Sequence, residues 1–298
     1  KFSKTTKLEI PDSSDSLPLS YNQRSLFHMS RVGHDDNDED KKNGGSSKSN
    51  SSLNIPLVAK LVGLDVDIDS LRAALELLVR RHEALRTIYI EEEEEKEPYS
   101  KCTQDEKKPF NVLELDATGW SDTKLRDWMI ETAETPFDLT EGPVIRIYLV
   151  WRDVSREDED EEKIEQYLHL TVHHIAVDLW SLVVMMDELA ILYKAAKGKS
   201  RFKRRKCMMA ALEVSPRYVK YAVSQRRLLQ SSEFRDETEK YWRQVFEDSV
   251  PVLSLPTDYP RPPRRSFQGA AFSFRIPNDV TTKLQQYCRS NRCTMFTV

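Results

Sequence analysis

The sequence predicts a mixed α/β sandwich, because two kinds of hydrophobic period follow one another along the chain. Residues 69–81 place leucine, alanine and valine at intervals of three and four, which is the spacing of one helix face. Residues 144–151 instead carry apolar side chains at every second position, as a strand with one buried face does. A long apolar run at 181–195 is typical of a buried helix. Helices and strands mixed in this order fit helices packed on a sheet.

The first predicted helix begins at a cap, Asp69, and ends near Arg80 and Arg81, and residues 82–89 then lead into a strand. A second helix is expected at 121–133. In chain order, the later elements that we expect are a strand at 144–151, a strand at 166–174, a helix at 181–195, helices near 215–229 and 233–246, an extended proline-rich segment at 251–263 and a strand at 272–276.

Composition limits the class of protein. The chain has 298 residues, of which 39% are hydrophobic and 9% aromatic, enough for a sizeable core in one large domain or two lobes. A net charge of -4 argues against a general nucleic-acid binder, and the sequence has no apolar run of the roughly 18 residues that a membrane span needs. The segment 1–7 lacks the apolar stretch of a signal peptide.

Four cysteines are scattered without the spacing of a zinc site, so we expect no metal centre and a reduced, cytoplasmic setting. They are Cys102, Cys207, Cys288 and Cys293.

The candidate catalytic residues gather where the strand 166–174 ends. Successive side chains of a strand point to opposite faces, so His174 shares a face with Val172, whereas His173 shares the other face with Thr171. The two histidines therefore cannot do the same job.

Asp178 stands where the next helix needs its N-cap. A helix N-terminus that opens beside His174 favours negative charge, which is useful where an oxyanion develops. Histidine, with an ordinary pKa of about 6.5, is the natural proton carrier near neutral pH. Without further support, a histidine on an apolar face is more often a hydrogen-bonded core residue than a catalyst.

The segment His173-His-Ile-Ala-Val-Asp-Leu-Trp-Ser181 resembles the active-site motif of the condensation domains of nonribosomal peptide synthetases, which belong to the chloramphenicol acetyltransferase-like superfamily. Other segments are similar to motifs of that family, in the same order. They are Leu17-Pro-Leu-Ser-Tyr-Asn-Gln-Arg-Ser-Leu-Phe27, Arg81-His-Glu-Ala-Leu-Arg-Thr87, Thr135-Pro-Phe-Asp-Leu-Thr-Glu-Gly-Pro-Val-Ile-Arg146, and Leu255-Pro-Thr-Asp-Tyr-Pro-Arg-Pro-Pro263 with Phe267-Gln-Gly-Ala270. The resemblance covers nearly the whole chain.

The resemblance implies two similar lobes, each a two-layer α/β sandwich. Residues 14–225 would form the N-terminal lobe with the His-His motif. Residues 226–298 would supply connecting helices and the incomplete start of a truncated C-terminal lobe, with 295–298 as its first helix.

The family's site residues map onto this chain one by one. The resemblance makes His174 the residue of the chemistry, with His173 and Asp178 supporting its geometry. Leu179, Trp180 and Ser181 would contact substrate, and backbone N–H groups near the first two would face the oxyanion. An arginine would pair with Asp178 and support the site; the candidates are Arg86, Arg146 and Arg275. Breaking such a buried pair would cost about 3–5 kcal/mol.

Two departures from the family pattern stand out. Leu179 replaces the glycine that usually follows the motif aspartate, and its side chain is expected to narrow the pocket or mark a different acceptor. The fourth motif appears as Tyr218-Val-Lys-Tyr-Ala-Val-Ser-Gln225, with lysine for aspartate and serine for tryptophan, which puts the packing there in doubt.

The function that the resemblance implies is acyl transfer that forms an amide (peptide) bond between a thioester donor tethered to a carrier protein and an amine acceptor, in nonribosomal peptide or hybrid polyketide-peptide synthesis. The partners would be acyl or peptidyl carrier proteins and adjacent synthase domains, and the phosphopantetheine arms would belong to those carriers, with no cofactor bound by this chain. Two alternatives stay open: a coenzyme A-dependent alcohol or amine acyltransferase of the same superfamily, and a noncatalytic docking remnant.

Four charged or polar runs interrupt the motifs. Residues 34–52, 91–97 and 155–163 cannot bury enough apolar area to offset chain entropy, so we expect mobile loops. The basic stretch 197–206 follows a predicted helix end and is expected to be a loop as well. Its charge also fits a nuclear signal, a nucleic-acid patch or a docking surface for an acidic carrier protein.

Overall fold

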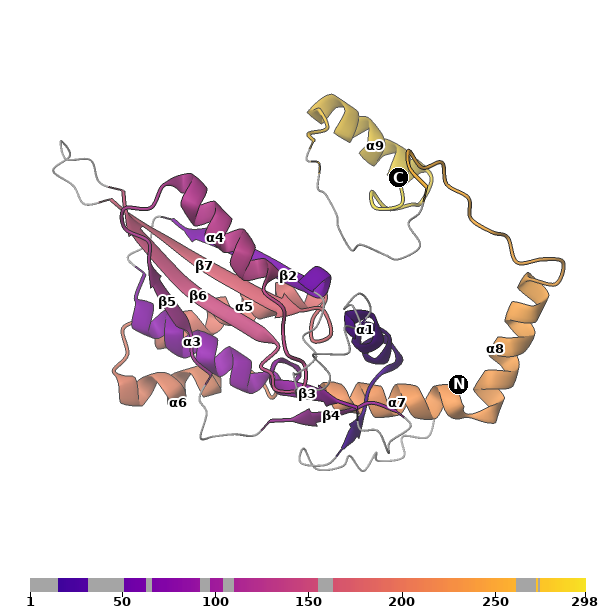
Figure 1. Ribbon diagram of the computed structural model, residues 1–298, viewed down its shortest axis with the longest axis horizontal. Coiled ribbons are helices and arrows are strands. Elements are labelled where there is room, and N and C mark those ends of the chain that lie inside the picture. Colours follow the sequence, from indigo (N-terminus) through magenta and orange to yellow (C-terminus); the bar gives the residue numbers. More distant parts are fainter. Residues whose placement is uncertain are drawn as a thin grey trace, which may run out of the picture. The chain divides into compact units, whose positions relative to one another are not determined.

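A four-stranded sheet in the order β2-β7-β6-β5 organises the larger part of the chain (Figure 1). In this computed structural model the residues described are 16–31, 51–62, 66–91, 97–103, 110–154, 163–260, 272 and 274–298. The chain divides into one unit at 1–261 and a second at 262–298, and each is described by itself. The lobe boundary expected at residue 225 stays a prediction.

The strands of the large sheet are β2 (Asn54–Leu61), β5 (Leu113–Asp116), β6 (Ile145–Asp153) and β7 (Ile164–His173). β7 is antiparallel to both of its neighbours, whereas β5 is parallel to β6. Because β7 is an inner strand with helices over both faces, its last six residues are all buried. The active-site motif thus begins at the end of the most enclosed strand of this sheet.

Three helices cover one face of the sheet, and a fourth covers the other (Figure 1). α3 (Ile68–Arg81), α5 (Leu179–Ala196) and α6 (Arg201–Ala211) pack on the face that carries Leu170 and Val172. α4 (Asp122–Glu134) lies over the opposite face, where Leu125 packs on Val150. The alternation of β7 therefore sorts apolar side chains toward α3 and α5, and histidines toward α4.

A small sheet in the order β1-β4-β3 joins the N-terminal segment to the rest of the first unit. Its strands are β1 (Leu17–Pro18), β3 (Thr87–Ile90) and β4 (Tyr99–Cys102). The other described elements of the first unit are α1 (Tyr21–Arg31), α7 (Tyr218–Gln230), α8 (Ser232–Val245) and the short 3-10 helices η1 (Ser51–Leu53) and η2 (Glu83–Arg86).

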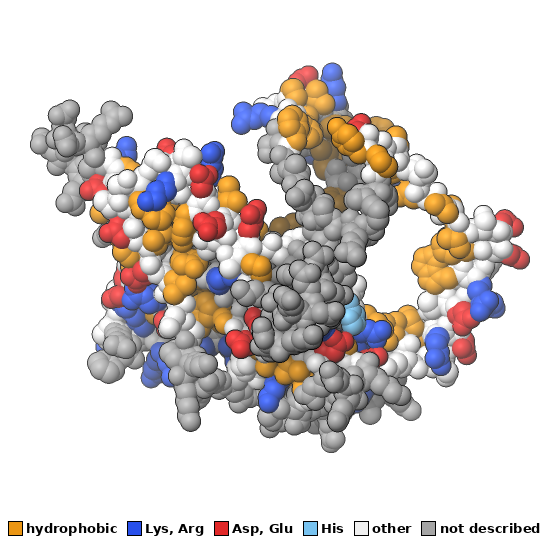
Figure 2. Space-filling view, in the orientation of Figure 1, with side chains coloured by type: hydrophobic (Ala, Val, Ile, Leu, Met, Phe, Trp, Pro, Cys, Tyr) orange, Lys and Arg blue, Asp and Glu red, His pale blue; other side chains and the backbone are white. Residues whose placement is uncertain are grey.

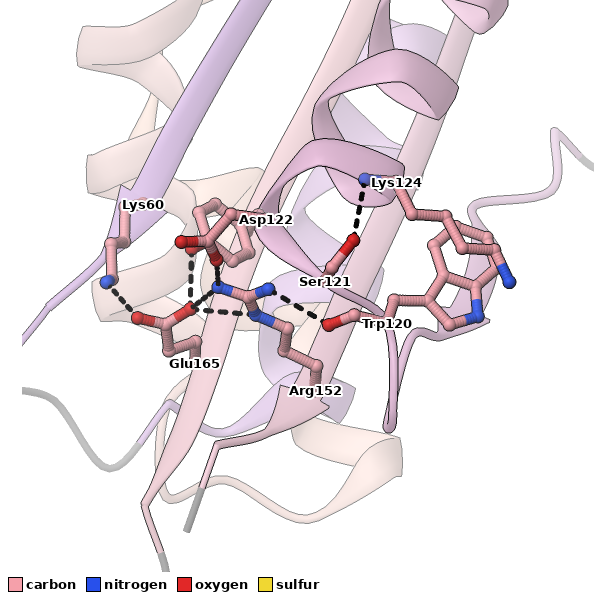
Figure 3. Close-up of polar contacts among 8 residues, drawn as sticks. Lys60, Trp120, Ser121, Asp122, Lys124, Arg152 and Glu165 are labelled. Carbon is pink, nitrogen blue, oxygen red and sulfur yellow. Dashed lines mark hydrogen bonds and ion pairs between the residues drawn. The ribbon is translucent and has the colours of Figure 1, made fainter. Parts of the chain in front are cut away.

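An ionic cluster closes the end of the large sheet away from His173 (Figure 3). Arg152 on β6 donates to Glu165 on β7 at 2.7 Å and also pairs with Asp122 at the start of α4, while Lys60 on β2 donates to Glu165. Arg152 is only 6% exposed, so this guanidinium depends on its two carboxylates. The cluster lies roughly 25 Å along the strand from His173 and fastens three strands and one helix together.

Several sequence expectations need correction. The N-cap of α3 is Asp67, which accepts the N–H of Ser70 at 3.1 Å, and not Asp69. Residues 201–206 belong to helix α6 rather than to a loop, because Met208 of that helix is buried in the main core. Pairing with Arg204 at 3.5 Å reinforces the true cap, Asp67.

In the described part of the second unit, α9 (Asn278–Ser290) is a helix, whereas 295–297 form a turn rather than the predicted helix. Residues 272 and 274–276 are not strand, and 273 lies outside the described residues. The expected loops fall largely outside the described residues too, at 34–50, 92–96 and 155–162.

Helix α8 buries none of its residues, and its apolar side chains gather on the surface (Figure 2). Trp242 stacks on Phe246 with ring centroids 5.6 Å apart, and Tyr241 meets Trp242 edge-on.

Candidate active site

His174 stands in the turn between β7 and α5, and its imidazole is fixed in one tautomer. Its backbone N–H donates to the Leu53 carbonyl at 2.8 Å, and its Nδ1 lies 2.8 Å from the Val177 carbonyl oxygen. A carbonyl oxygen can only accept, so Nδ1 must carry the proton that it donates. In the neutral ring Nε2 then has the free lone pair, and no described residue bonds to it. The side chain is exposed, so this lone pair can meet an incoming molecule.

His173 has the opposite environment. It is fully buried, its Nδ1 accepts the Ile175 N–H at 3.1 Å, and its ring meets Phe137 edge-on at 6.2 Å. Burial, helped by the neighbouring His174, lowers the pKa of His173 from 6.5 to about 4. His173 is therefore neutral at physiological pH, and it holds the turn that carries His174.

Asp178 caps helix α5, as its place in the sequence predicts. Its Oδ1 accepts both the backbone N–H of Ser181 at 2.8 Å and the Ser181 hydroxyl at 2.6 Å. The Ser181 side chain and backbone hydrogen bonds hold the pKa of the Asp178 carboxyl below its usual range. Ser181 was expected to contact substrate, but its hydroxyl donates its hydrogen to the Asp178 carboxylate of this cap.

Leu179 and Trp180 form an exposed apolar pair on the first turn of α5. They are 78% and 75% exposed, and no described residue accepts their backbone N–H groups. A helix N-terminus leaves such groups unpaired and carries a partial positive charge. A base, unpaired N–H donors and an apolar wall therefore lie within one short stretch, 174–180, as acyl transfer requires.

Among the described arginines of the first unit, none pairs with Asp178. Arg86 donates to the carbonyls of Val79, Arg80 and Thr103 at 2.9–3.2 Å, so it fastens the end of α3 to the small sheet.

Arg146 donates to the carbonyls at the end of α4, including that of Pro136 at 3.3 Å, and stacks over Phe137 at 4.0 Å. Arg275 lies in the second unit, so its pairing with Asp178 stays a prediction. Within the first unit, Asp178 is an exposed cap held by Ser181.

The Arg81-to-Arg86 motif ties α3 to α5. Glu188 of α5 accepts two hydrogen bonds from Arg81, at 2.9 and 3.1 Å, and lies 2.6 Å from Nε2 of His82. Burial pushes the pKa of Glu188 up, but the hydrogen bonds from Arg81 and His82 outweigh it and leave the pKa below its usual range. Glu83 of the same motif pairs with Arg217 at 2.8 Å. These polar residues hold the helices together and do not point to a reaction.

The first and fourth motifs meet in space although about 200 residues separate them. Ser20 and Gln23 form a reciprocal capping box at the start of α1, with distances of 3.1 Å in both directions. The Ser20 hydroxyl also lies 3.0 Å from the Tyr218 hydroxyl, and Gln225 accepts the N–H of Tyr21 at 3.0 Å. The packing that the altered fourth motif put in doubt is therefore present.

Two features of the site were missed in the sequence. The Val177 carbonyl fixes the His174 tautomer, and no side-chain pattern reports a backbone oxygen. Glu188 could have been noticed as one of two acids in an otherwise apolar run. Among the described residues, no group of three or more His, Cys, Asp or Glu side chains is placed to hold a metal ion, and no described helix is long and apolar enough to cross a membrane.

Comparison with known sequences gives a consistent result. The family profile described as Condensation domain matches residues 45–298. The chain is 29% identical over 283 residues to malpinin synthetase of Mortierella alpina, and 29% identical over 289 residues to bacitracin synthase 2 of Bacillus licheniformis. These matches cover 94% and 96% of the chain but only 3% and 9% of the two relatives, so the chain spans a small part of their length.

Solved structures share the fold. The X-domain from teicoplanin biosynthesis matches 96% of this chain and 56% of its own, with a TM-score of 0.66 and 22% identity. A four-domain nonribosomal peptide synthetase bound to AMP and glycine matches 95% of this chain and 18% of its own, with a TM-score of 0.66 and 18% identity. The predicted α/β fold is confirmed, and the chain belongs to the condensation-domain family.

Proposed function

We propose that this chain catalyses acyl transfer from a thioester tethered to a carrier protein to an amine, forming an amide bond. The observation that carries the proposal is the His174 imidazole. Its Nδ1–H is held by the Val177 carbonyl at 2.8 Å, no described residue bonds to its Nε2, and the residue is exposed beside the capped N-terminus of α5. The chain matches the profile described as Condensation domain and is similar to malpinin synthetase and bacitracin synthase 2, which supports the choice of amine acceptor and carrier-bound donor.

The step balances with the groups present. The acceptor nitrogen attacks the thioester carbonyl carbon while Nε2 of His174 accepts a proton from that nitrogen. The oxyanion that forms faces the N–H groups of Leu179 and Trp180. The C–S bond then breaks, and the proton leaves His174 for the departing thiolate. His173 and Asp178 act through geometry: one holds the turn, and the other caps the helix that presents the donors.

Positioning supplies much of the rate in this proposal. Proton transfer by a placed base contributes roughly 10²–10⁴-fold, whereas holding two reactants together contributes about 7–11 kcal/mol. A thioester is already activated and an amine is a good nucleophile. A loss of only about tenfold in His174→Ala would place His174 mainly in the role of orienting the amine.

The partners that follow from the proposal are acyl or peptidyl carrier proteins and neighbouring synthase domains. The phosphopantetheine arm that bears the thioester enters as part of the substrate. We place the chain in the cytoplasm, where its four free cysteines stay reduced.

The test is amide formation by the chain in its native polypeptide context, with matched acyl donors on a carrier protein and on coenzyme A. We expect His174→Ala to slow transfer from the carrier-bound donor, while His28→Ala, which changes an exposed histidine on α1, leaves it unchanged. Faster transfer from coenzyme A would favour the soluble-donor acyltransferase. If the parent chain and His174→Ala both bind the carrier protein but neither forms an amide, the chain has a docking role and the proposal is refuted.

A further inference from the structure

Helix α9 of the second unit ends in a backbone motif that brings two cysteines together. The N–H of Cys293 donates to the carbonyl of Cys288 at 3.0 Å, and the N–H of Arg292 reaches the carbonyl of Arg289 at 3.5 Å. Arg292 has a φ of 51°, the left-handed conformation that closes a Schellman motif. That motif places the residues at its two ends, here Cys288 and Cys293, in side-chain contact.

Apolar side chains usually make this contact, but here three sulfur atoms gather at it. The Cys288 Sγ lies 3.6 Å from the Met295 Sδ, and the backbone hydrogen bond from Cys293 to Cys288 brings the third sulfur-bearing side chain to the same turn. Cys288 is 5% exposed, Cys293 is half-buried and Met295 is 44% exposed. The cluster therefore combines one buried sulfur side chain with two that are partly open to solvent.

The spacing suits one small soft cation. Three sulfur ligands about 2.3 Å from a metal in a trigonal plane lie roughly 4 Å apart, close to the 3.6 Å between Cys288 and Met295. Thiolate and thioether ligands together select Cu(I), whereas zinc sites take nitrogen, oxygen and thiolate. The C-terminal end of a helix carries partial negative charge, so a cation is favoured there.

The same environment argues against a reactive or redox-sensing thiol. Burial first, and then the neighbouring Cys293, raise the pKa of the Cys288 thiol. Reactive cysteines need a lowered pKa, which a helix N-terminus or a nearby cation provides. A helix C-terminus does the reverse, and it stabilises a bound cation rather than a bare thiolate.

We propose that Cys288, Cys293 and Met295 form a three-sulfur site for Cu(I). Binding exchanges the thiol protons of Cys288 and Cys293 for the metal and changes no oxidation state, so it needs no oxidant or reductant. The site is independent of the acyl-transfer proposal, because all its ligands lie within 288–295 of the second unit.

The experiment is anaerobic titration of the reduced full chain with Cu(I) in competition with the chromophoric chelator bathocuproine disulfonate. We expect the chain to hold one Cu(I) against the chelator. Cys288→Ser or Cys293→Ser should weaken binding by more than about 100-fold, and Met295→Leu by at least about tenfold. Cys207→Ser removes a half-buried cysteine elsewhere in the chain and should leave the affinity unchanged.

Met295→Leu conserves volume, so it separates loss of a ligand from loss of the fold, and thermal melting of each variant checks this. The proposal is overturned if Cys207→Ser weakens binding as much as the site variants do, or if Met295→Leu binds as the parent chain does. It is also overturned if Cys288 and Cys293 oxidise to a disulfide in air while the reduced chain holds no Cu(I).

Discussion

Replacing Asp178 by alanine tests whether this carboxylate is a helix cap or half of a buried ion pair. Its Oδ1 accepts two hydrogen bonds, both from Ser181, and no described arginine of the first unit pairs with it. The carboxylate is exposed, so its removal leaves no buried charge behind.

The two roles predict different free energies of unfolding. Loss of an N-cap costs typically about 1 kcal/mol, whereas loss of one partner of a buried ion pair costs about 3–5 kcal/mol. We therefore expect Asp178→Ala to lose about 1 kcal/mol, a fall of roughly 2–4 °C in Tm for a unit of this size. The activation free energy of acyl transfer should rise by more than this loss of stability, because the first turn of α5 carries the N–H groups of Leu179 and Trp180.

Asp67 offers a matched control. It caps α3 through the same pair of bonds, accepting the Ser70 N–H at 3.1 Å and the Ser70 hydroxyl at 2.5 Å. Asp67→Ala should cost a similar free energy in urea denaturation, or slightly more because Arg204 also pairs with it, yet leave acyl transfer unchanged. Asp178→Asn keeps a good cap without the charge and should retain most of the activity.

Two results would refute this reasoning. An unfolding cost above about 3 kcal/mol for Asp178→Ala would mean that the carboxylate is paired and buried in the folded protein. Equal damage from Asp178→Asn and Asp178→Ala would show that the negative charge, and not the cap, is what matters.

Three further predictions concern single side chains. Leu179→Gly should lower the free energy of unfolding by less than about 1 kcal/mol, because the Leu179 side chain is 78% exposed. If Leu179 narrows the entrance to the active site, the variant should transfer branched donors up to roughly tenfold faster. Unchanged relative rates for branched and linear donors would contradict this. The pKa of His173 is lowered from 6.5 to about 4 in the folded chain, so on acidification the unfolded chain takes up this proton at a higher pH than the folded chain does. About 3 kcal/mol of the free energy of unfolding should therefore be lost as pH falls from 6.5 to 4. His173→Gln should flatten that part of the stability curve in urea titrations, with the remainder belonging to His169, whose pKa burial also lowers. Hydrogen bonding, first from Lys60, holds the pKa of Glu165 at about 2 instead of 4.5. Its contribution to the free energy of unfolding is therefore complete above pH 4.5 and is lost as pH falls toward 2. Glu165→Gln should remove roughly 2 kcal/mol of stability at pH 7 and flatten the stability curve only between pH 4.5 and 2.

Much of the fold could be predicted because its strong periods and caps are local. Ser121 and Asp178 were placed correctly as helix starts, and β6 and β7 begin and end within two residues of expectation. The strand β2 was missed because it is an edge strand that contains Pro56, a residue that weakens a strand pattern.

Other errors came from effects that only tertiary contacts decide. Asp69 was expected to cap α3, but the hydrogen bond from the Ser70 N–H goes to Asp67, two residues earlier. The basic stretch reads as a solvated loop until Met208 is seen in the core. In the site, strand alternation separated His173 from His174, but the proton on Nδ1 depends on a backbone oxygen that the sequence does not mark.

The motifs that identify this chain serve mainly to hold it together. Arg81, His82 and Glu83 each have a charged partner, and Ser20 and Gln23 satisfy one another. A residue with such a partner is tied to its neighbours, so its match to a family motif reports packing and not chemistry. His174 differs, because one ring nitrogen is fixed, no described residue bonds to the other, and the residue is exposed. Similarity over the whole set of motifs therefore establishes the fold, while the case for catalysis depends on this imidazole and on the unpaired N–H groups at the start of α5.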